Sequence, residues 1–195
     1  INSMSKKLKN TRILVGAQNC HENETFGPFT GHINSLMLKN VGAKFVIIGH
    51  SENRKTGETN KMINLKIKSA LKSGLKVIFC VGETIKEKRK KITKQVLKKQ
   101  INLGLNRVKN TKNILIAYEP VWSIGSGLVP VSKELFDTID FIKKNFKKYK
   151  VLYGGSVNPK NILELRLINN IDRFLVGGAS QDPNKFIDII KKTYN

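Results

Sequence analysis

Cysteine, tryptophan and acidic residues are scarce in this sequence, and long apolar runs are lacking. Its 195 residues include two cysteines, one tryptophan and 14 acidic residues. Cys20 and Cys80 are too few for a disulfide framework and lack metal-ligand spacing, so we expect a reducing, cytoplasmic location. No apolar run approaches the roughly 20 residues of a membrane-spanning helix, and the opening residues do not resemble a signal peptide. We therefore expect neither a membrane span nor export.

Basic residues, in contrast, are abundant and give a formal net charge of +22. Such a charge suits nucleic acid, an anionic surface or an anionic substrate. Lysine carries most of it, whereas arginine is favoured for base reading and bidentate phosphate contacts. The lysines also fall in runs, such as 87–91 and 143–148, that are typical of solvated helix faces. We therefore rank nucleic-acid binding last among the candidate functions.

Short runs rich in valine and isoleucine recur along the chain and predict six β-strands. Their apolar residues are continuous, as in parallel strands that are covered on both faces. The predicted strands are residues 13–15, 45–48, 76–81, 114–118, 151–153 and 174–176.

Helical patterns lie between these runs. Thr59 precedes an apolar stripe that ends at Gly74, and further helices are expected to open at Ser132, Asn158-Pro159 and Asp182-Pro183. The segment 84–110 is compatible with one helix or two. Strict strand–helix alternation predicts an α/β fold, either a doubly wound sheet or a barrel. The length suits one domain over residues 1–195.

Polar residues follow the predicted strands at the carboxyl ends, where parallel α/β folds place their active sites. Glu119 directly follows the fourth strand, where burial strengthens a carboxylate as a base; a solvated loop glutamate or an ion-pair partner is the equal alternative. His50 ends the second strand and is suited to polarise a carbonyl, although a histidine that caps a helix is the commoner case. His21 and His32 have no partner spacing, so we expect no metal site.

Glycine pairs follow the last two strands, at 154–155 and 177–178. Glycines let backbone N–H groups approach a phosphate, and barrels commonly bind phosphate at this place. After Glu119 comes an apolar loop bounded by Pro120 and Pro130. It is either an ordinary packed connection or a lid that closes over the site.

At this point the sequence resembles the triosephosphate isomerase family. The segment 118–127, Tyr-Glu-Pro-Val-Trp-Ser-Ile-Gly-Ser-Gly, is similar to the family's base and lid, and the segment 49–54, Gly-His-Ser-Glu-Asn-Arg, is similar to its electrophile segment. Further signatures follow in the family's order: Gly27-Pro28-Phe29-Thr30-Gly31, Cys80-Val81-Gly82-Glu83, Tyr153-Gly154-Gly155-Ser156-Val157 and Leu175-Val176-Gly177-Gly178-Ala179-Ser180.

The resemblance implies a TIM (β/α) barrel that interconverts the small phosphorylated trioses dihydroxyacetone phosphate and glyceraldehyde 3-phosphate in glycolysis and gluconeogenesis. It implies no cofactor and no metal. Glu119 would move a proton through an enediolate, His50 would polarise the carbonyl oxygens, and Glu52 would be a supporting carboxylate. The phosphate would be held by backbone N–H groups of Gly125, Ser156, Gly177 and Gly178. The implied lid consists of Pro120, Val121, Trp122, Ser123, Ile124, Gly125, Ser126 and Gly127.

The sequence also departs from the family pattern. The family begins with a strand that ends in Asn-x-Lys, but no such strand precedes Ile13, and residues 1–9 resemble the tail of the second helix. We therefore expect an incomplete barrel of six units that lacks the first strand–helix unit and the second strand, with weak or no activity. Its open edges predict self-association into a homo-oligomer. His32 and Asn53 replace charges near the family's subunit contact, which predicts an altered interface. A catalytically silent fragment that binds phosphate or assembles with itself is the alternative.

Overall fold

The computed structural model describes residues 1–194, whose contacts cluster into two compact units. The first unit comprises Ile1–Cys80 and Lys99–Leu115, and the second comprises Val81–Lys98 and Ile116–Asn195. One domain over residues 1–195 stays a prediction.

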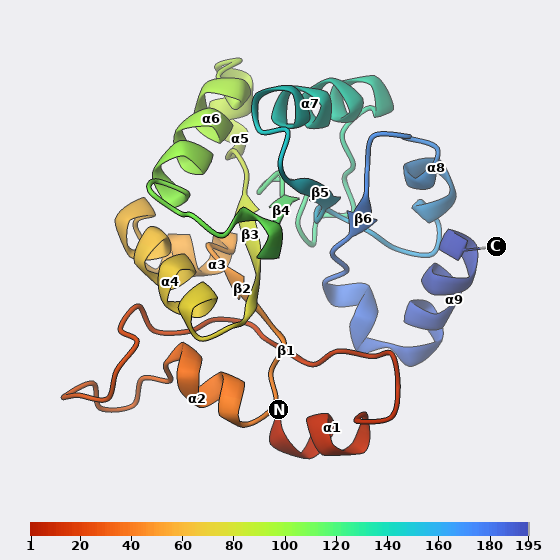
Figure 1. Cartoon of the computed structure of the whole chain (residues 1–195). Coiled ribbons are helices and arrows are strands. Elements are labelled where there is room, and N and C mark those ends of the chain that lie inside the picture. The colour runs from red at the N-terminus through yellow and green to blue at the C-terminus, as the bar shows by residue number, and fades with distance from the viewer. Residues whose placement is uncertain (195) are drawn as a thin grey trace. The chain divides into compact units, whose positions relative to one another are not determined.

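Strands alternate with helices along the chain, as the sequence predicts (Figure 1). In the described part of the chain, the strands form one sheet in chain order, β1-β2-β3-β4-β5-β6. β2 runs parallel to β1 and β3, with Phe45 opposite Gly16 and Lys76, and β5 runs parallel to β6, with Leu152 opposite Arg173. The strands are β1 Gly16–Ala17, β2 Phe45–Ile48, β3 Lys76–Val81, β4 Ile114–Tyr118, β5 Lys150–Tyr153 and β6 Arg173–Phe174.

Two predicted strand positions are wrong. The run 13–15 is not a strand, since the side chains of Ile13 and Leu14 are 62% and 53% exposed and regular pairing begins only at Gly16. The last strand is Arg173–Phe174 and not 174–176, although the Leu175 N–H still donates to the Tyr153 carbonyl at 2.9 Å. In both cases pairing with a neighbouring strand, and not apolar character, sets the boundary.

The helices follow their capping signals in most places. In the first unit lie α1 Asn2–Lys7, α2 Ser35–Asn40, α3 Ser51–Lys55 and α4 Asn60–Lys72. In the second lie α5 Ile85–Arg89, α7 Ser132–Asn145, α8 Ile162–Arg166 and α9 Pro183–Tyr194, while α6 Thr93–Gly104 has residues in both units. Short 3₁₀ turns are η1 Thr111–Asn113 and η2 Gly178–Gln181.

Individual helix starts test the capping signals. The Thr59 hydroxyl accepts the Met62 N–H at 3.2 Å and so caps α4, and the Asp182 carboxylate accepts the Asn184 N–H at 2.9 Å at the start of α9. Ser132 is not the N-cap of α7, because Val131 holds that position. Residues 84–110 form two helices, since the backbone of Lys91 adopts a left-handed φ of 57° between α5 and α6.

Apolar side chains from the strands and from one face of each long helix form the core of each unit. In the first unit Val46, Ile63 and Phe79 are fully buried, and in the second Ile116 and Ile139 are fully buried. None of the helices within residues 1–194 is both long and apolar enough to cross a membrane.

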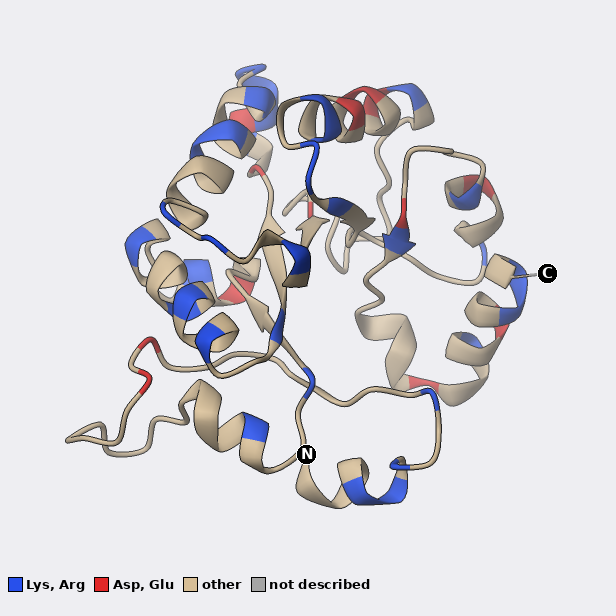
Figure 2. Cartoon of the chain, in the orientation of Figure 1, with Lys and Arg blue, Asp and Glu red and all other residues tan. Residues whose placement is uncertain are grey.

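Lysines and arginines lie on helices of both units (Figure 2). One lysine is an exception to this surface placement, because Lys66 on α4 is only 7% exposed and pairs with the buried carboxylate of Glu58. The Lys66 ammonium also donates to Asn19 Oδ1 at 3.1 Å. The sequence gives no signal for this buried pair, since it joins residues that are far apart along the chain.

Candidate active site

Glu119 lies at the carboxyl end of β4 in the second unit, and it is only 2% exposed. Its backbone N–H donates to the Val81 carbonyl at 2.8 Å, which continues the strand pairing to the position of the carboxylate. Two glycines make room for it. A Cβ on Gly154 would lie 2.8 Å from Glu119 Cγ, and a Cβ on Gly82 would lie 1.8 Å from the Glu119 carbonyl oxygen. The solvated-loop alternative for Glu119 is therefore excluded.

A second buried carboxylate, Glu83, anchors the segment after Glu119. Trp122 Nε1 donates to it at 2.8 Å, the Tyr118 hydroxyl donates at 3.3 Å, and the Val121 N–H donates to the Glu83 carbonyl at 3.0 Å. Burial raises the pKa of Glu83 above its ordinary value of 4.5, while the Trp122 hydrogen bond acts in the opposite direction. Burial, followed by the charge of Glu83, raises the pKa of Tyr118 well above 10.

The predicted lid, 120–127, begins buried and becomes exposed toward its glycines. The ammonium of Lys88 on α5 lies 3.8 Å from the centre of the Trp122 ring and pairs with Glu134 of α7. Gly125 and Gly127 have φ of +67° and +78°, a region that residues with a Cβ rarely adopt. The segment is thus an anchored loop with a glycine-rich, exposed tip.

The predicted phosphate donors, Gly125, Ser156, Gly177 and Gly178, all belong to the second unit. Neither packing nor backbone conformation explains Gly177 and Gly178, because neither has a positive φ and a Cβ on either would meet no atom of the described residues within 4 Å. Their openness fits a place that is kept clear for a ligand. The Ser156 N–H, in contrast, donates to Ser123 Oγ at 3.1 Å.

His50 belongs to the first unit, where it ends β2 and caps α3. Its Nδ1 accepts the backbone N–H of Glu52 at 3.4 Å, which confirms the capping alternative. Because Nδ1 is an acceptor, the neutral ring carries its proton on Nε2, and capping and catalysis use different nitrogens. Glu52 Oε2 lies 3.7 Å from Nδ1, and the Glu52 side chain is 80% exposed.

Arg54 holds the His50 segment in place, a role that sequence reasoning missed. Its guanidinium donates to the carbonyl of Gly49 at 2.7 Å and of Cys80 at 3.1 Å, and to Asn60 Oδ1 at 2.8 Å. These bonds tie α3 to the ends of β2 and β3. That Glu119 and His50 face a common pocket stays a prediction.

Metal binding finds no support in residues 1–194, where no group of three or more His, Cys, Asp or Glu side chains is suited to hold an ion. The rings of His21 and His32 lie 4.3 Å apart, and Cys20 and Cys80 are free thiols. Burial raises the pKa of Cys20 to about 12.

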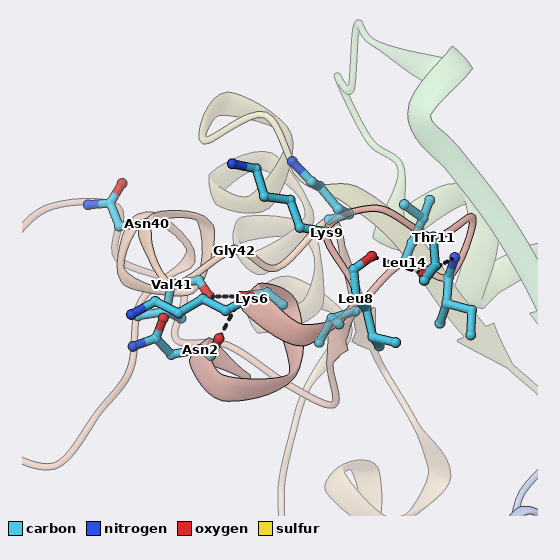
Figure 3. Close-up of a pocket in the computed structure, with 13 residues that line it drawn as sticks. Asn2, Lys6, Leu8, Lys9, Thr11, Leu14, Asn40, Val41 and Gly42 are labelled. Atoms are coloured by element: carbon cyan, nitrogen blue, oxygen red, sulfur yellow. Dashed lines mark hydrogen bonds between the residues drawn. The ribbon is translucent and has the colours of Figure 1, made fainter.

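A pocket in the first unit lies among α1, the segment after it and the end of α2 (Figure 3). The hydroxyl of Ser5 donates to the Asn2 and Val41 carbonyls there, and the hydroxyl of Thr11 donates to the Leu8 carbonyl. None of the predicted site residues lines this pocket.

Polar side chains and glycines that follow successive parallel strands are typical of α/β enzymes. The family model described as "Triosephosphate isomerase" matches residues 1–193. The triosephosphate isomerase of Thermodesulfovibrio yellowstonii is 44% identical over 201 residues, which cover 98% of this chain and 81% of that protein. That of Dictyoglomus thermophilum is 45% identical, with 96% and 80% covered. The crystal structure of the enzyme from Bartonella henselae gives a TM-score of 0.90 at 35% identity and covers 100% of this chain and 83% of that one.

The chain therefore belongs to the triosephosphate isomerase family, a family of isomerases. Its fold is that of a TIM barrel, which has eight strands in its complete form. The residues described here contribute six of them.

Proposed function

We propose that this chain interconverts dihydroxyacetone phosphate and glyceraldehyde 3-phosphate by proton transfer through an enediolate, without a cofactor. Membership of the family supports the reaction, and the buried carboxylate of Glu119 at the end of β4 is the observation that carries the residue assignment. The substrate class is a small phosphorylated triose.

Glu119 is the base in this proposal. Its carboxylate takes the proton from the carbon beside the carbonyl and returns it to the neighbouring carbon, so that no proton is gained or lost overall. The two glycines around it, Gly82 and Gly154, fix the side chain in one place. Such positioning supplies much of the advantage of an enzymatic base over one in solution.

His50 is the electrophile, and it donates from Nε2 to the carbonyl oxygen on which charge develops. The Glu52 N–H keeps Nδ1 as an acceptor and so supports the neutral ring with its proton on Nε2. The exposed Glu52 carboxylate has a lesser, supporting role through its position 3.7 Å from Nδ1.

Backbone N–H groups of Gly125, Ser156, Gly177 and Gly178 hold the phosphate, and the lid covers it. The open surroundings of Gly177 and Gly178 support this assignment. The lid excludes water, and an enediolate that is exposed to solvent would eliminate its phosphate.

Replacement of Glu119 by glutamine tests the proposal. Glu119→Gln should lower turnover by about a hundredfold or more, since it removes the general base while keeping the shape. Glu164→Gln, the same change at an exposed position of α8 in the same unit, is the matched control and should behave as the unaltered chain. A coupled assay measures turnover, and deuterium uptake from D₂O into the substrate extends the range downward. Activity retained in Glu119→Gln would end the assignment.

The alternative is a catalytically silent barrel fragment that binds phosphate or assembles with itself. It is favoured by one feature of the sequence, in which no strand ending in Asn-x-Lys precedes β1. Loss of one charge-stabilising group costs roughly a hundred- to a thousandfold in rate, so we propose low turnover for this chain. A coupled assay that detects no isomerisation while phosphate still binds would favour the silent fragment.

A further inference from the structure

The hydroxyl of Ser123 connects three segments of the second unit. Ser123 is fully buried in the first half of the lid. Its Oγ donates to the Leu128 carbonyl at 2.5 Å, lies 3.2 Å from the Tyr153 hydroxyl, and accepts the Ser156 N–H at 3.1 Å. One side chain thus joins the two arms of the lid to the glycine-rich end of β5.

The directions of these bonds follow from the capacity of a hydroxyl, which has one proton and two acceptor sites. The proton goes to the Leu128 carbonyl, and the Ser156 N–H takes one acceptor site. Tyr153 must therefore donate to the other site. Burial raises the pKa of Tyr153 to about 12, so the phenol keeps the proton that this arrangement needs. The hydroxyl of Ser123 is fully used.

The glycine at position 155 is a condition for this arrangement. A Cβ there would lie 2.7 Å from Ser123 Oγ and 2.3 Å from the Tyr153 hydroxyl oxygen. The local backbone is therefore built to admit the Ser123 hydroxyl to the Ser156 amide. The proposed function requires that same amide for phosphate, and one N–H does not serve both oxygens at full strength.

We propose that Ser123 is a positioning residue whose hydroxyl substitutes for a phosphate oxygen at the Ser156 amide. It holds the lid to the end of β5 and gives up that amide when phosphate binds, so phosphate binding and release of the lid are coupled. The inference rests on the phosphate site of the proposed function.

The test uses the full chain and inorganic phosphate as the probe. Trp122, the single tryptophan of the sequence, reports phosphate binding by its fluorescence from within the lid. Ser123→Ala removes the competing hydroxyl, and phosphate should then bind about three- to tenfold more tightly, the equivalent of one hydrogen bond. Thr138→Val removes another buried hydroxyl of the same unit, which donates to Glu134 on α7, and it should leave phosphate affinity unchanged.

A second measurement needs no substitution. In the unaltered chain, phosphate should shift the amide NMR signals of Ser156 and Leu128 with one common midpoint, since one hydroxyl bonds to both residues. Equal phosphate affinity in Ser123→Ala and the unaltered chain, or a Leu128 signal that does not respond, would overturn the latch and leave the phosphate site intact. If neither protein binds phosphate, the phosphate site of the proposed function fails, and the latch fails with it.

Discussion

Glycine at position 154 is set by the side chain of Glu119. An added methyl group would lie 2.8 Å from Glu119 Cγ and 3.2 Å from its Oε1, closer than side chains normally pack. The carboxylate is buried, so it has little space into which it can move. The geometry of the proposed base therefore depends on a neighbour 35 positions further along the chain.

Gly154→Ala should accordingly misplace the base while leaving the phosphate donors in position. We expect kcat to fall by about a hundredfold with little change in KM, since a misplacement of about 1 Å is enough for such a loss. Gly178→Ala is the comparison, because its methyl group meets nothing in the described part of the chain and should raise KM instead. Steady-state kinetics distinguish the two, and an unchanged kcat in Gly154→Ala would contradict the packing explanation.

At the scale of an element, the lid is held by a carboxylate outside it. Glu83 receives hydrogen bonds from Trp122 and Tyr118, and Lys88 lies over the Trp122 ring. The attachment of the loop therefore depends on the ionisation state of one buried group.

The pH dependence follows from the raised pKa of Glu83. Because the folded carboxyl holds its proton more tightly than the unfolded one, its contribution to the free energy of unfolding is greatest below pH 4.5 and declines as pH rises through the folded pKa. Protonation also weakens the charge-assisted bond from Trp122. Trp122 fluorescence should therefore titrate with a midpoint above 4.5, and Glu83→Gln should abolish the transition. A midpoint at or below 4.5, or a transition that persists in Glu83→Gln, would contradict this.

At the scale of the whole molecule, exposed apolar side chains and a large positive charge act against each other. Ile13 and Leu14 are exposed in the first unit beside the pocket of Figure 3, and in the second unit Ile187 and Tyr194 of α9 are 49% and 71% exposed. Such surfaces favour association, while a net charge of +22 opposes it through repulsion.

We therefore predict that the chain self-associates increasingly as salt rises from about 0.01 M to about 1 M, because the screening length falls from about 30 Å to about 3 Å. Light scattering measures the mass. Ile187→Glu should reduce association more than Asn184→Glu, which places the same charge on an exposed polar position of α9. A monomer at every salt concentration would refute the prediction.

Much of the architecture is already determined by local sequence patterns. Apolar runs placed β2, β3 and β4 correctly, and Thr59 and Asp182 marked the starts of α4 and α9, because burial on both faces and helix capping leave local signatures. The positions of Glu119 and His50 after their strands were likewise readable from the sequence.

Only the tertiary structure decided where pairing begins at β1 and ends at β6, how Lys66 and Glu58 pair, and which atoms meet the hydroxyl of Ser123. Each of these depends on a partner that is distant along the chain. A local pattern records how a residue prefers to be placed, whereas a hydrogen bond or an ion pair exists only when folding brings its second member within reach.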